Sequence, residues 1–302
     1  MGTHVPVMLH EVLDALAVVP GGVYADGTLG RAGHAREILR RGARRVIGID
    51  RDETALEEVR AMCIEGLDAV HGSHGEIAAL VKGRGVEEID GILLDLGVSS
   101  PQLDEAGRGF SFRADGPLDM RMDRTRGQTA ADVVASRSED ELANIFRTLG
   151  EEPAARRIAK AIVRERAHGR IGTTLQLAEI VAGTVGRRGA HHPATRVFQA
   201  LRMEVNDELG ELQRALEGGL GVLKTGGRFV VITFESLTDR IVKRFFAEHA
   251  GRTVSLQQGG TRWEGTLPRV RRVTRRALSP GRDEQMRNAR SRSAKMRAAE
   301  RI

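Results

Sequence analysis

Short apolar runs alternate with helical patterns through the first third of the chain. The apolar runs cover residues 23–26, 45–50, 67–70 and 90–95. Between them, apolar residues recur at helical spacing over residues 33–41, 54–65 and 76–82. A buried strand reads as a continuous apolar run, whereas an amphipathic helix repeats every three to four residues. The pattern therefore predicts βαβ units and a parallel sheet covered by helices.

The alternation stops after Pro101 for about a hundred residues, which is far longer than an ordinary loop. This stretch has helical patterns of its own, at residues 139–149, 154–168 and 175–185. A strand-like run returns only at residues 226–234, and helical patterns flank it at 206–223 and 238–249. We therefore expect an α/β fold, a doubly wound sheet interrupted after its fourth strand. The predicted parts are a core of 1–105 and 206–275, an inserted helical domain of 106–205, and a basic C-terminal tail of 276–302.

The fourth apolar run ends in a loop that contains several side chains able to bind a ligand or to react. Asp95 closes the run, and Ser99 and Gln102 follow in a Gly-Val-Ser-Ser-Pro-Gln segment. In open α/β sheets, ligands bind at the carboxyl ends of the strands, so these side chains are placed for binding or catalysis. The alternative is a strand followed by a helix that Ser99 or Ser100 merely caps.

A glycine-rich turn follows the first predicted strand and opens the first helix. Its glycines, Gly27, Gly30 and Gly33, allow a ligand to approach the backbone, and the start of the helix offers free amide donors. Their spacing is not the G-x-G-x-x-G of dinucleotide sites. Asp50 closes the next strand at the place where a carboxylate accepts hydrogen bonds from ribose hydroxyls. Together these features indicate a cofactor that contains adenosine.

Charge selects among adenosine cofactors. Asp26 precedes the glycine turn and Asp95 ends the fourth strand, so the site is acidic. Acidic surroundings suit a cationic sulfonium better than a pyrophosphate, which favours S-adenosylmethionine over NAD. The alternatives are that these acids only cap helices, or that the protein is a nicotinamide-dependent dehydrogenase.

The composition is that of a globular protein in a reducing compartment. The chain has 302 residues, 40% of them hydrophobic and 29% charged, and one cysteine, Cys63. Its N-terminus lacks a basic segment followed by an apolar one, and no apolar stretch is long enough to span a membrane. We expect a cytoplasmic protein with no membrane partner, and the sequence leaves its oligomeric state open.

Positive charge is concentrated at the C-terminus. Residues 262–302 hold 13 Lys and Arg against 4 Asp and Glu, a balance of +9, which leaves −3 (34 − 37) for residues 1–261. Clustered cations bind polyanions by releasing counterions, and nucleic acid is the expected partner. The alternative is a tail that is only solvated.

Long motifs carry a resemblance to a known family. They are His4-Val-Pro-Val-Met, Asp26-Gly-Thr-Leu-Gly, residues 90–104, Arg108-Gly-Phe-Ser-Phe, residues 115–123, residues 192–202, Val205-Asn-Asp-Glu-Leu and Arg290-Ser-Arg-Ser-Ala-Lys-Met-Arg. In these the chain resembles, nearly from end to end, the ribosomal RNA small subunit methyltransferase H (MraW) family. The resemblance implies a class I S-adenosylmethionine-dependent methyltransferase, Rossmann-like and with an all-helical insertion. It also implies transfer of a methyl group to the exocyclic N4 amine of a cytidine in the decoding region of 16S rRNA, as naked RNA or in the small ribosomal subunit.

The same resemblance assigns cofactor residues by position. Ala32, Gly33 and His34 would hold the methionine end of the cofactor and Asp50 its ribose. Three further residues would line the same pocket: His74, Asp95 and Gln102. The family usually has an aromatic residue, typically Phe, where this chain has His74.

Catalytic and substrate residues complete the hypothesis. The Asp95 loop would supply an oxygen, from its carboxylate or from a backbone carbonyl, that accepts a hydrogen bond from the target amine and stabilises its developing positive charge. The extruded base would be received by Phe110 and Phe112, which are alternatively core residues. Phosphates would be bound by Arg113, Arg196 and Arg202, which are alternatively paired with nearby acids. No metal is expected, because the adjacent His191 and His192 side chains would diverge. A noncatalytic RNA-binding assembly factor is the alternative function.

Overall fold

The computed structural model describes residues 6–186, 192–255, 258, 260–264 and 267–302. The chain forms two compact units. One comprises residues 1–97 and 210–302 and is called the sheet unit here, and the other, residues 98–209, is the helical unit. The insertion predicted after the fourth strand is thus present, with boundaries at 98 and 209 instead of 106 and 205.

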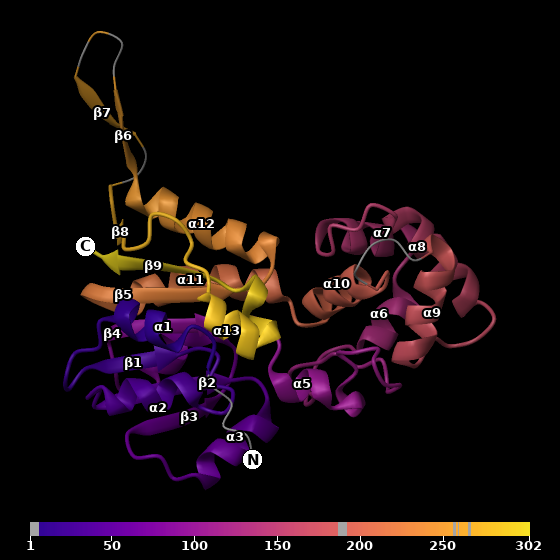
Figure 1. Cartoon of the computed structure of the whole chain (residues 1–302), viewed down its shortest axis with the longest axis horizontal. Helices are drawn as coiled ribbons and strands as arrows, with labels where there is room; N and C mark the ends of the chain where they lie inside the picture. Colours follow the sequence, from indigo (N-terminus) through magenta and orange to yellow (C-terminus); the bar gives the residue numbers. More distant parts are fainter. Residues whose placement is uncertain (1–5, 187–191, 256–257, 259, 265–266) are drawn as a thin grey trace. The chain divides into compact units, whose positions relative to one another are not determined.

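A seven-stranded sheet organises the sheet unit, in the order β3-β2-β1-β4-β5-β9-β8 (Figure 1). Its strands are β1 (Val23–Asp26), β2 (Arg45–Asp50), β3 (Leu67–His71), β4 (Ile89–Asp95), β5 (Leu223–Thr233), β8 (Val270–Arg272) and β9 (Lys295–Arg301). The strands β1 to β5 run parallel, and β9 is antiparallel to both β5 and β8. A separate hairpin is formed by β6 (Arg252–Ser255) and β7 (Thr261–Glu264). This order confirms the predicted doubly wound α/β fold.

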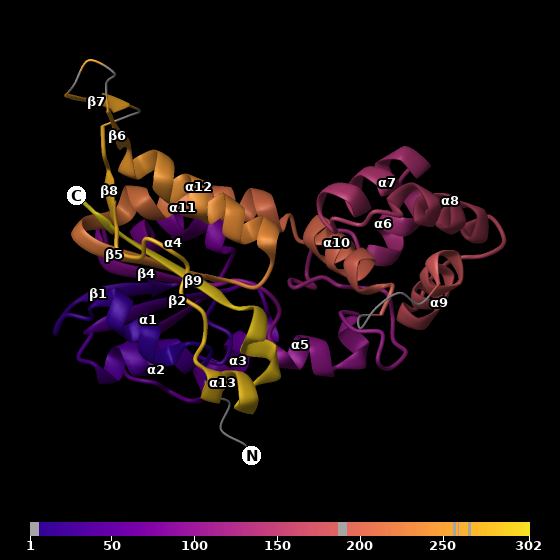
Figure 2. The same ribbon diagram turned by 45° about the horizontal axis from the view of Figure 1, so that its top comes forward.

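Helices cover both faces of the sheet (Figure 2). One apolar core joins the sheet to α4 (Ile77–Lys82), α11 (Glu208–Val222) and α12 (Ser236–Ala250). The other joins it to α1 (Leu9–Leu16), α2 (Gly33–Arg40) and α3 (Glu53–Ala61). Along β4, Ile92 and Leu94 belong to the first core and Leu93 to the second, because successive strand residues point to opposite faces. Burial on both faces explains the continuous apolar runs.

The sheet reverses its winding between β1 and β4. From β1 the order runs through β2 to β3 in one direction and through β4 to β5 in the other. Such a switch point leaves a crevice at the carboxyl ends of the two central strands. Asp26 ends β1 and Asp95 ends β4, and Asp26 is in register with Leu93. The fold therefore brings the acidic ends of both strands to the ligand-binding edge.

The C-terminal residues are part of the sheet and do not form the expected free tail. β9 lies between β5 and β8, and it follows α13 (Arg282–Arg287) and the 3₁₀ turn η3 (Ala289–Ser293). Met296 and Ala298 are buried, while Arg297 donates to the Asp239 carboxylate at 2.7 Å. Charged residues at alternate positions gave this strand the appearance of a solvated basic segment.

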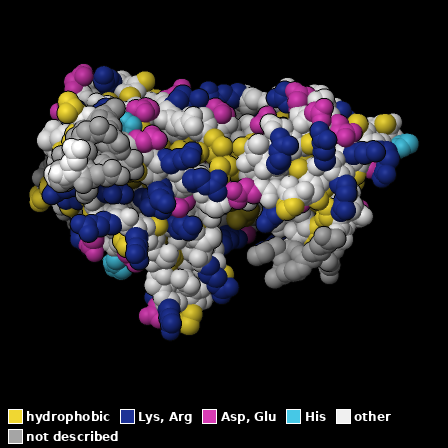
Figure 3. All heavy atoms as spheres, turned by 90° about the horizontal axis from the view of Figure 1, so that it is seen from above, with side chains coloured by type: hydrophobic (Ala, Val, Ile, Leu, Met, Phe, Trp, Pro, Cys, Tyr) yellow, Lys and Arg dark blue, Asp and Glu magenta, His cyan; other side chains and the backbone are white. Residues whose placement is uncertain are grey.

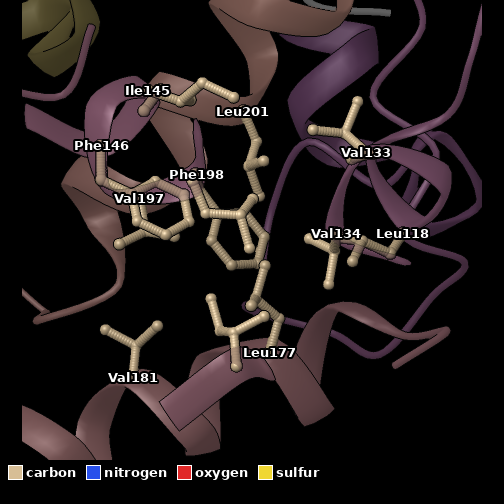
Figure 4. Packing of buried hydrophobic residues seen from close by; sticks show 14 of the residues in the cluster. Leu118, Val133, Val134, Ile145, Phe146, Leu177, Val181, Val197, Phe198 and Leu201 are labelled. Atoms are coloured by element: carbon tan, nitrogen blue, oxygen red, sulfur yellow. The ribbon is translucent and has the colours of Figure 1, made fainter. Parts of the chain in front are cut away.

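The helical unit has its own apolar core. Its helices are α5 (Ser100–Asp104), α6 (Ala130–Ser136), α7 (Glu139–Thr148), α8 (Ala155–Arg166), α9 (Thr174–Val185) and α10 (Thr195–Val205), with the 3₁₀ turn η2 (Ala106–Arg108). Capping boxes at Thr129, Ser138 and Thr173 start α6, α7 and α9. Phe146, Leu177 and other buried residues of this unit point toward one another (Figure 4). None of the helices in the described residues has the length and hydrophobicity that a lipid bilayer demands.

Candidate active site

The turn after β1 is held by hydrogen bonds to its own carboxylates. The Asp26 Oδ1 atom accepts from the Thr28 amide at 3.1 Å, and the Thr28 hydroxyl accepts from the Asp95 amide at 2.7 Å. Gly30 and Ala32 have φ values of 50° and 58°. These left-handed conformations coil the backbone so that α2 begins at Gly33, with its first amides at the sheet edge. Thr28 thus joins the acidic ends of β1 and β4.

Asp50, at the end of β2, also reaches this turn. Its Oδ2 atom accepts from the Gly30 amide at 2.7 Å, and its Oδ1 atom accepts from the Asp52 amide at 2.9 Å. Burial is the main cause that raises the Asp50 pKa, and the backbone donors oppose it. Each carboxylate oxygen has two lone pairs, so both can accept a further hydrogen bond from a ligand hydroxyl. Asp50 thus ends β2 and lies beside the glycine turn, and its contact with the ribose stays a prediction.

Asp95 is a strongly perturbed carboxyl group at this edge. Its side chain is 23% exposed, yet its Oδ1 atom is buried and accepts no hydrogen bond from the described residues. Burial, followed by the charges of Asp26 and Glu284, raises the Asp95 pKa from 3.8 to about 7. Burial and the Asp50 charge likewise raise the Asp26 pKa to about 7. A buried acceptor among like charges favours a cationic or proton-donating ligand.

His34 lies on the first turn of α2 and faces two different groups. Its Nε2 atom is 3.0 Å from the Val7 carbonyl, and its Nδ1 atom is 3.9 Å from the Asp95 Oδ2 atom. The ring is buried. A Cβ atom at Gly33 would come within 2.6 Å of the Pro6 ring, so glycine is required where the N-terminal segment crosses α2.

His74 lies beyond β3, across from the glycine turn. A Cβ atom at Gly27 would come within 3.1 Å of the His74 Cβ atom. Burial, followed by the Arg51 charge, lowers the His74 pKa to about 3, so the imidazole is neutral. Its Nε2 atom is buried without a hydrogen-bond partner among the described residues. Ser73 holds this turn by accepting from Arg51 at 2.7 Å and donating to Glu211 of α11.

Glu284 is a site residue that the sequence reasoning missed. It lies on α13, and its Oε1 atom accepts from the Met8 amide at 2.9 Å. Its charge also acts on Asp95. The sequence shows only an acidic pair within a basic segment, Asp283-Glu284, and this pattern does not indicate the contact with Met8.

Gln102 lies in the helical unit, on α5. Its side-chain oxygen accepts from the Ser99 backbone amide at 3.0 Å, and its backbone amide donates to the Ser99 hydroxyl. This is a capping box, so the capping role considered for Ser99 is confirmed. The expectation that Gln102 shares a pocket with Asp95 stays a prediction.

The two phenylalanines predicted to receive a base differ in burial. Phe110 is 7% exposed and belongs to the core of the helical unit, with the Arg108 guanidinium 5.9 Å from its ring centroid. Phe112 is only partly buried, and its ring lies 4.5 Å from that of His192 and 4.8 Å from that of Phe198. Phe112 is therefore the more exposed of the two phenylalanines. His191 lies outside the described residues.

The three predicted phosphate-binding arginines are also unequal. Arg113 is exposed. Arg196 is exposed and donates to the Glu151 carbonyl at 3.0 Å. Arg202 is buried and forms a bidentate pair with Glu208, with nitrogen to oxygen distances of 2.6 and 2.9 Å. Its pairing partner is thus Glu208 and not the nearby Glu204.

The residues at the sheet edge form a coherent donor and acceptor set. Asp50 presents oxygens suited to hydroxyls, the start of α2 presents amides suited to a carboxylate, and Asp26 and Asp95 provide negative charge. The buried, unpartnered Asp95 Oδ1 and His74 Nε2 atoms add two polar contacts. A nucleoside that carries an amino acid and a positive charge matches all of these features.

Comparison with known proteins gives full-length matches. The model of the MraW methylase family matches residues 1–302. Proteins named ribosomal RNA small subunit methyltransferase H are similar to this chain. The one from Methylobacterium nodulans is 51% identical, covering 100% of this chain and 91% of that protein. The one from Geobacter sulfurreducens is 50% identical, covering 99% of both. A solved rRNA methylase from Streptococcus thermophilus has a TM-score of 0.41 and 11% identity, with 99% of each chain covered.

Proposed function

Because this chain belongs to the MraW methylase family, we propose that it transfers a methyl group from S-adenosylmethionine to the N4 amine of a cytidine in the decoding region of 16S rRNA. The match over the entire chain to proteins named as small subunit rRNA methyltransferases carries this proposal. Membership of this family also excludes the alternative that the protein is a nicotinamide-dependent dehydrogenase.

The cofactor is assigned to the carboxyl edge of the sheet unit. Asp50 would accept hydrogen bonds from the ribose hydroxyls, and the backbone from Ala32 to His34 would bind the methionine carboxylate. Asp26 and Asp95 would attract the positive charge of the sulfonium. When bound, S-adenosylmethionine supplies an activated methyl group. Gln102 and His74 remain proposed contacts.

Replacing Asp50 with Asn should weaken cofactor binding. The carboxylate would lose charge-assisted hydrogen bonds to ribose, worth about 1.5–3 kcal/mol together, so the dissociation constant should rise about 10- to 100-fold. Calorimetric titration with S-adenosylhomocysteine measures this change. Asp68→Asn is the matched control, because Asp68 pairs with Arg45 and Arg84 at the opposite end of β3. Equal affinities of both variants for S-adenosylhomocysteine would show that Asp50 does not bind the cofactor.

In the proposed reaction, the Asp95 carboxylate accepts a proton. The lone pair of the cytosine amine is delocalised into the ring, so it is a weak nucleophile until an acceptor withdraws a proton from it. The Asp95 Oδ1 atom is a buried acceptor with no donor from the described residues. Held near attack distance, the amine nitrogen would take the methyl group that S-adenosylmethionine supplies, and the electron pair of the carbon–sulfur bond would stay on sulfur. The amine proton passes to Asp95.

Exposed cations on the sheet unit are proposed to attract the RNA backbone. Lys243 and Arg244 of α12 are exposed, and among the described residues neither forms an ion pair. Arg272, Arg275 and Arg276, in or just after β8, are also exposed. Figure 3 shows Lys and Arg side chains gathered on the face that carries α12. In the helical unit, Phe112, Arg113 and Arg196 remain the proposed substrate contacts, whereas Phe110 and Arg202 are occupied by packing and by Glu208.

Removing two of these cations should reduce the salt dependence of RNA binding. For the double variant Lys243→Gln, Arg244→Gln, the slope of log affinity against log salt should fall by about two, because each phosphate contact contributes about one. Filter binding of 16S rRNA over a range of salt concentrations measures it. Arg60→Gln is the control, since Arg60 already pairs with Glu53. An unchanged slope in the double variant would exclude this face as the surface that binds RNA.

Analysis of modified nucleosides tests the function itself. Small subunits and naked 16S rRNA that lack the modification are incubated with the protein and S-adenosylmethionine, then digested and analysed by mass spectrometry. N4-methylcytidine is the expected product. Binding of the RNA without any methylated nucleoside would instead support a noncatalytic assembly factor, and methylation of another atom would move the reaction to a different acceptor.

A further inference from the structure

One imidazole of the site is held between an acceptor and a carboxylate. The His34 Nε2 atom lies 3.0 Å from the Val7 carbonyl oxygen. A carbonyl only accepts hydrogen bonds, so the proton of the neutral ring must be on Nε2. The Nδ1 atom of that tautomer carries a lone pair, and it faces the Asp95 Oδ2 atom at 3.9 Å. Two acceptors therefore face each other, and a proton shared between them would stabilise both.

The surroundings keep this tautomer in place. Pro6 packs against Gly33 directly before His34, which positions the N-terminal segment over α2. Met8, the residue after Val7, donates its amide to Glu284 of α13 at 2.9 Å. The 3.9 Å separation from Asp95 is an ion-pair distance, longer than a hydrogen bond. Catalytic hydrogen bonds are often long before substrates bind, and they shorten in the complex.

We propose that His34 is the proton partner of Asp95, receiving on Nδ1 the proton that Asp95 takes from the target amine. This inference rests on the proposed function. The nitrogen–methyl bond forms as the carbon–sulfur bond breaks, its electron pair stays on sulfur, and the amine proton moves by way of Asp95 to the imidazole. No other reactant is required. The backbone at His34 binds the cofactor in the proposed function, and its side chain now gains a separate role.

Charge balance supports this assignment. Before transfer, the sulfonium provides one positive charge next to the Asp95 carboxylate. After transfer the sulfur is neutral, and an imidazolium at His34 restores a positive charge beside Asp95. The other groups near Asp95 are the carboxylates of Asp26, from β1, and Glu284, from α13, and both favour a cation at His34. The net charge of the buried site therefore stays constant during the reaction.

The variant His34→Gln separates proton uptake from positioning. A Gln side-chain amide can still donate to the Val7 carbonyl, but it cannot take up a proton. We expect the variant to keep its affinity for S-adenosylhomocysteine, since the donated hydrogen bond remains, and to lose about 10²-fold in single-turnover methyl transfer. His10→Gln is the matched control, because His10 is exposed on α1. Transfer by His34→Gln at the wild-type rate would overturn the inference.

Nitrogen-15 NMR of the wild-type protein provides a second test that does not depend on the variant or on RNA. At pH 8 the His34 ring should be the Nε2–H tautomer. The pKa of the His34 ring should be higher in the complex with S-adenosylhomocysteine than in the complex with S-adenosylmethionine, because S-adenosylmethionine is a cation. An Nδ1–H tautomer, or equal titration in both complexes, would overturn the proposal.

The two hypotheses fail in different ways. If the wild-type protein makes no N4-methylcytidine, the proposed function fails and the proton role fails with it. If the wild type makes this product and His34→Gln makes it equally fast, only the role of His34 is wrong.

Discussion

Replacing Asp95 with Asn should slow methyl transfer by about 10²–10⁴-fold, the range that general base catalysis contributes. Asn is nearly the same size as Asp, but its side chain cannot accept the amine proton. The Asp95 backbone amide donates to Thr28, and this bond does not depend on the side chain, so the turn should stay folded. The loss should therefore appear in the chemical step, with cofactor and RNA binding weakened far less.

Single-turnover transfer of labelled methyl to 16S rRNA measures this loss. Asp14→Asn serves as the control, since Asp14 is exposed on α1. Calorimetry with S-adenosylhomocysteine shows whether the variant still forms the site. An Asp95→Asn protein that binds both partners and transfers methyl at the wild-type rate would contradict the role of Asp95 as proton acceptor.

Periodicity alone predicted most of the sheet unit. The four apolar runs correspond to β1 to β4, and the run at 226–234 falls on β5. The strands β1, β2, β4 and β5 were readable because both of their faces are buried, whereas β3 lies at the edge of the sheet with only Val70 buried. In contrast, β9 was missed, since it lies near the edge of the sheet and alternates Arg297 and Arg301 with buried residues. The short helices α1, α6 and α13 were also missed, whereas α2 and α4, which are equally short, were predicted because they lie between apolar runs that mark strands.

The candidate site was predictable where it depends on strand ends. Asp26, Asp50 and Asp95 follow apolar runs, and parallel strands bring their carboxyl ends to one edge. Glu284 and Val7 were not predictable, because long-range contacts place them there and no local pattern reports such contacts. The pairing of Arg202 with Glu208 depends on how the chain turns after α10, which spacing alone does not give.

The same carboxylates that suit a cation reduce the stability of the protein without its ligand. Asp26 and Asp95 are buried close together, so ionising both is costly. Their titrations are coupled, and a measured pKa near 7 belongs to the pair. Binding of a sulfonium would offset the repulsion. An active site that is strained when empty is a common reason why function and stability oppose each other.

Acid should therefore have opposite effects on the stability and the activity of this protein. The Asp95 pKa is about 7 in the folded protein against an ordinary value of 3.8. Between these values the folded state binds more protons than the unfolded state, so this group contributes stability that is lost as the pH rises through 7. The gap corresponds to at most about 4 kcal/mol, and we expect about 1–4 kcal/mol. The reaction needs the ionised form, so its rate should fall about tenfold for each pH unit well below 7.

Comparing the wild type with Asp95→Asn removes the Asp95 carboxyl group together with its interaction with Asp26, so the difference reports this coupled pair. Urea unfolding at pH 8 should show the variant to be more stable by about 1–4 kcal/mol, and at pH 5 the two should differ by much less. Single-turnover rates of the wild type from pH 5 to pH 8 should rise over the interval in which this stability difference grows. The stability difference should stop growing near pH 7, and the rate should level off at or below that pH, because the bound sulfonium favours the ionised carboxylate. A stability difference that does not change with pH would mean that Asp95 is ionised at every pH tested. The loss of rate at low pH would then be caused by another group.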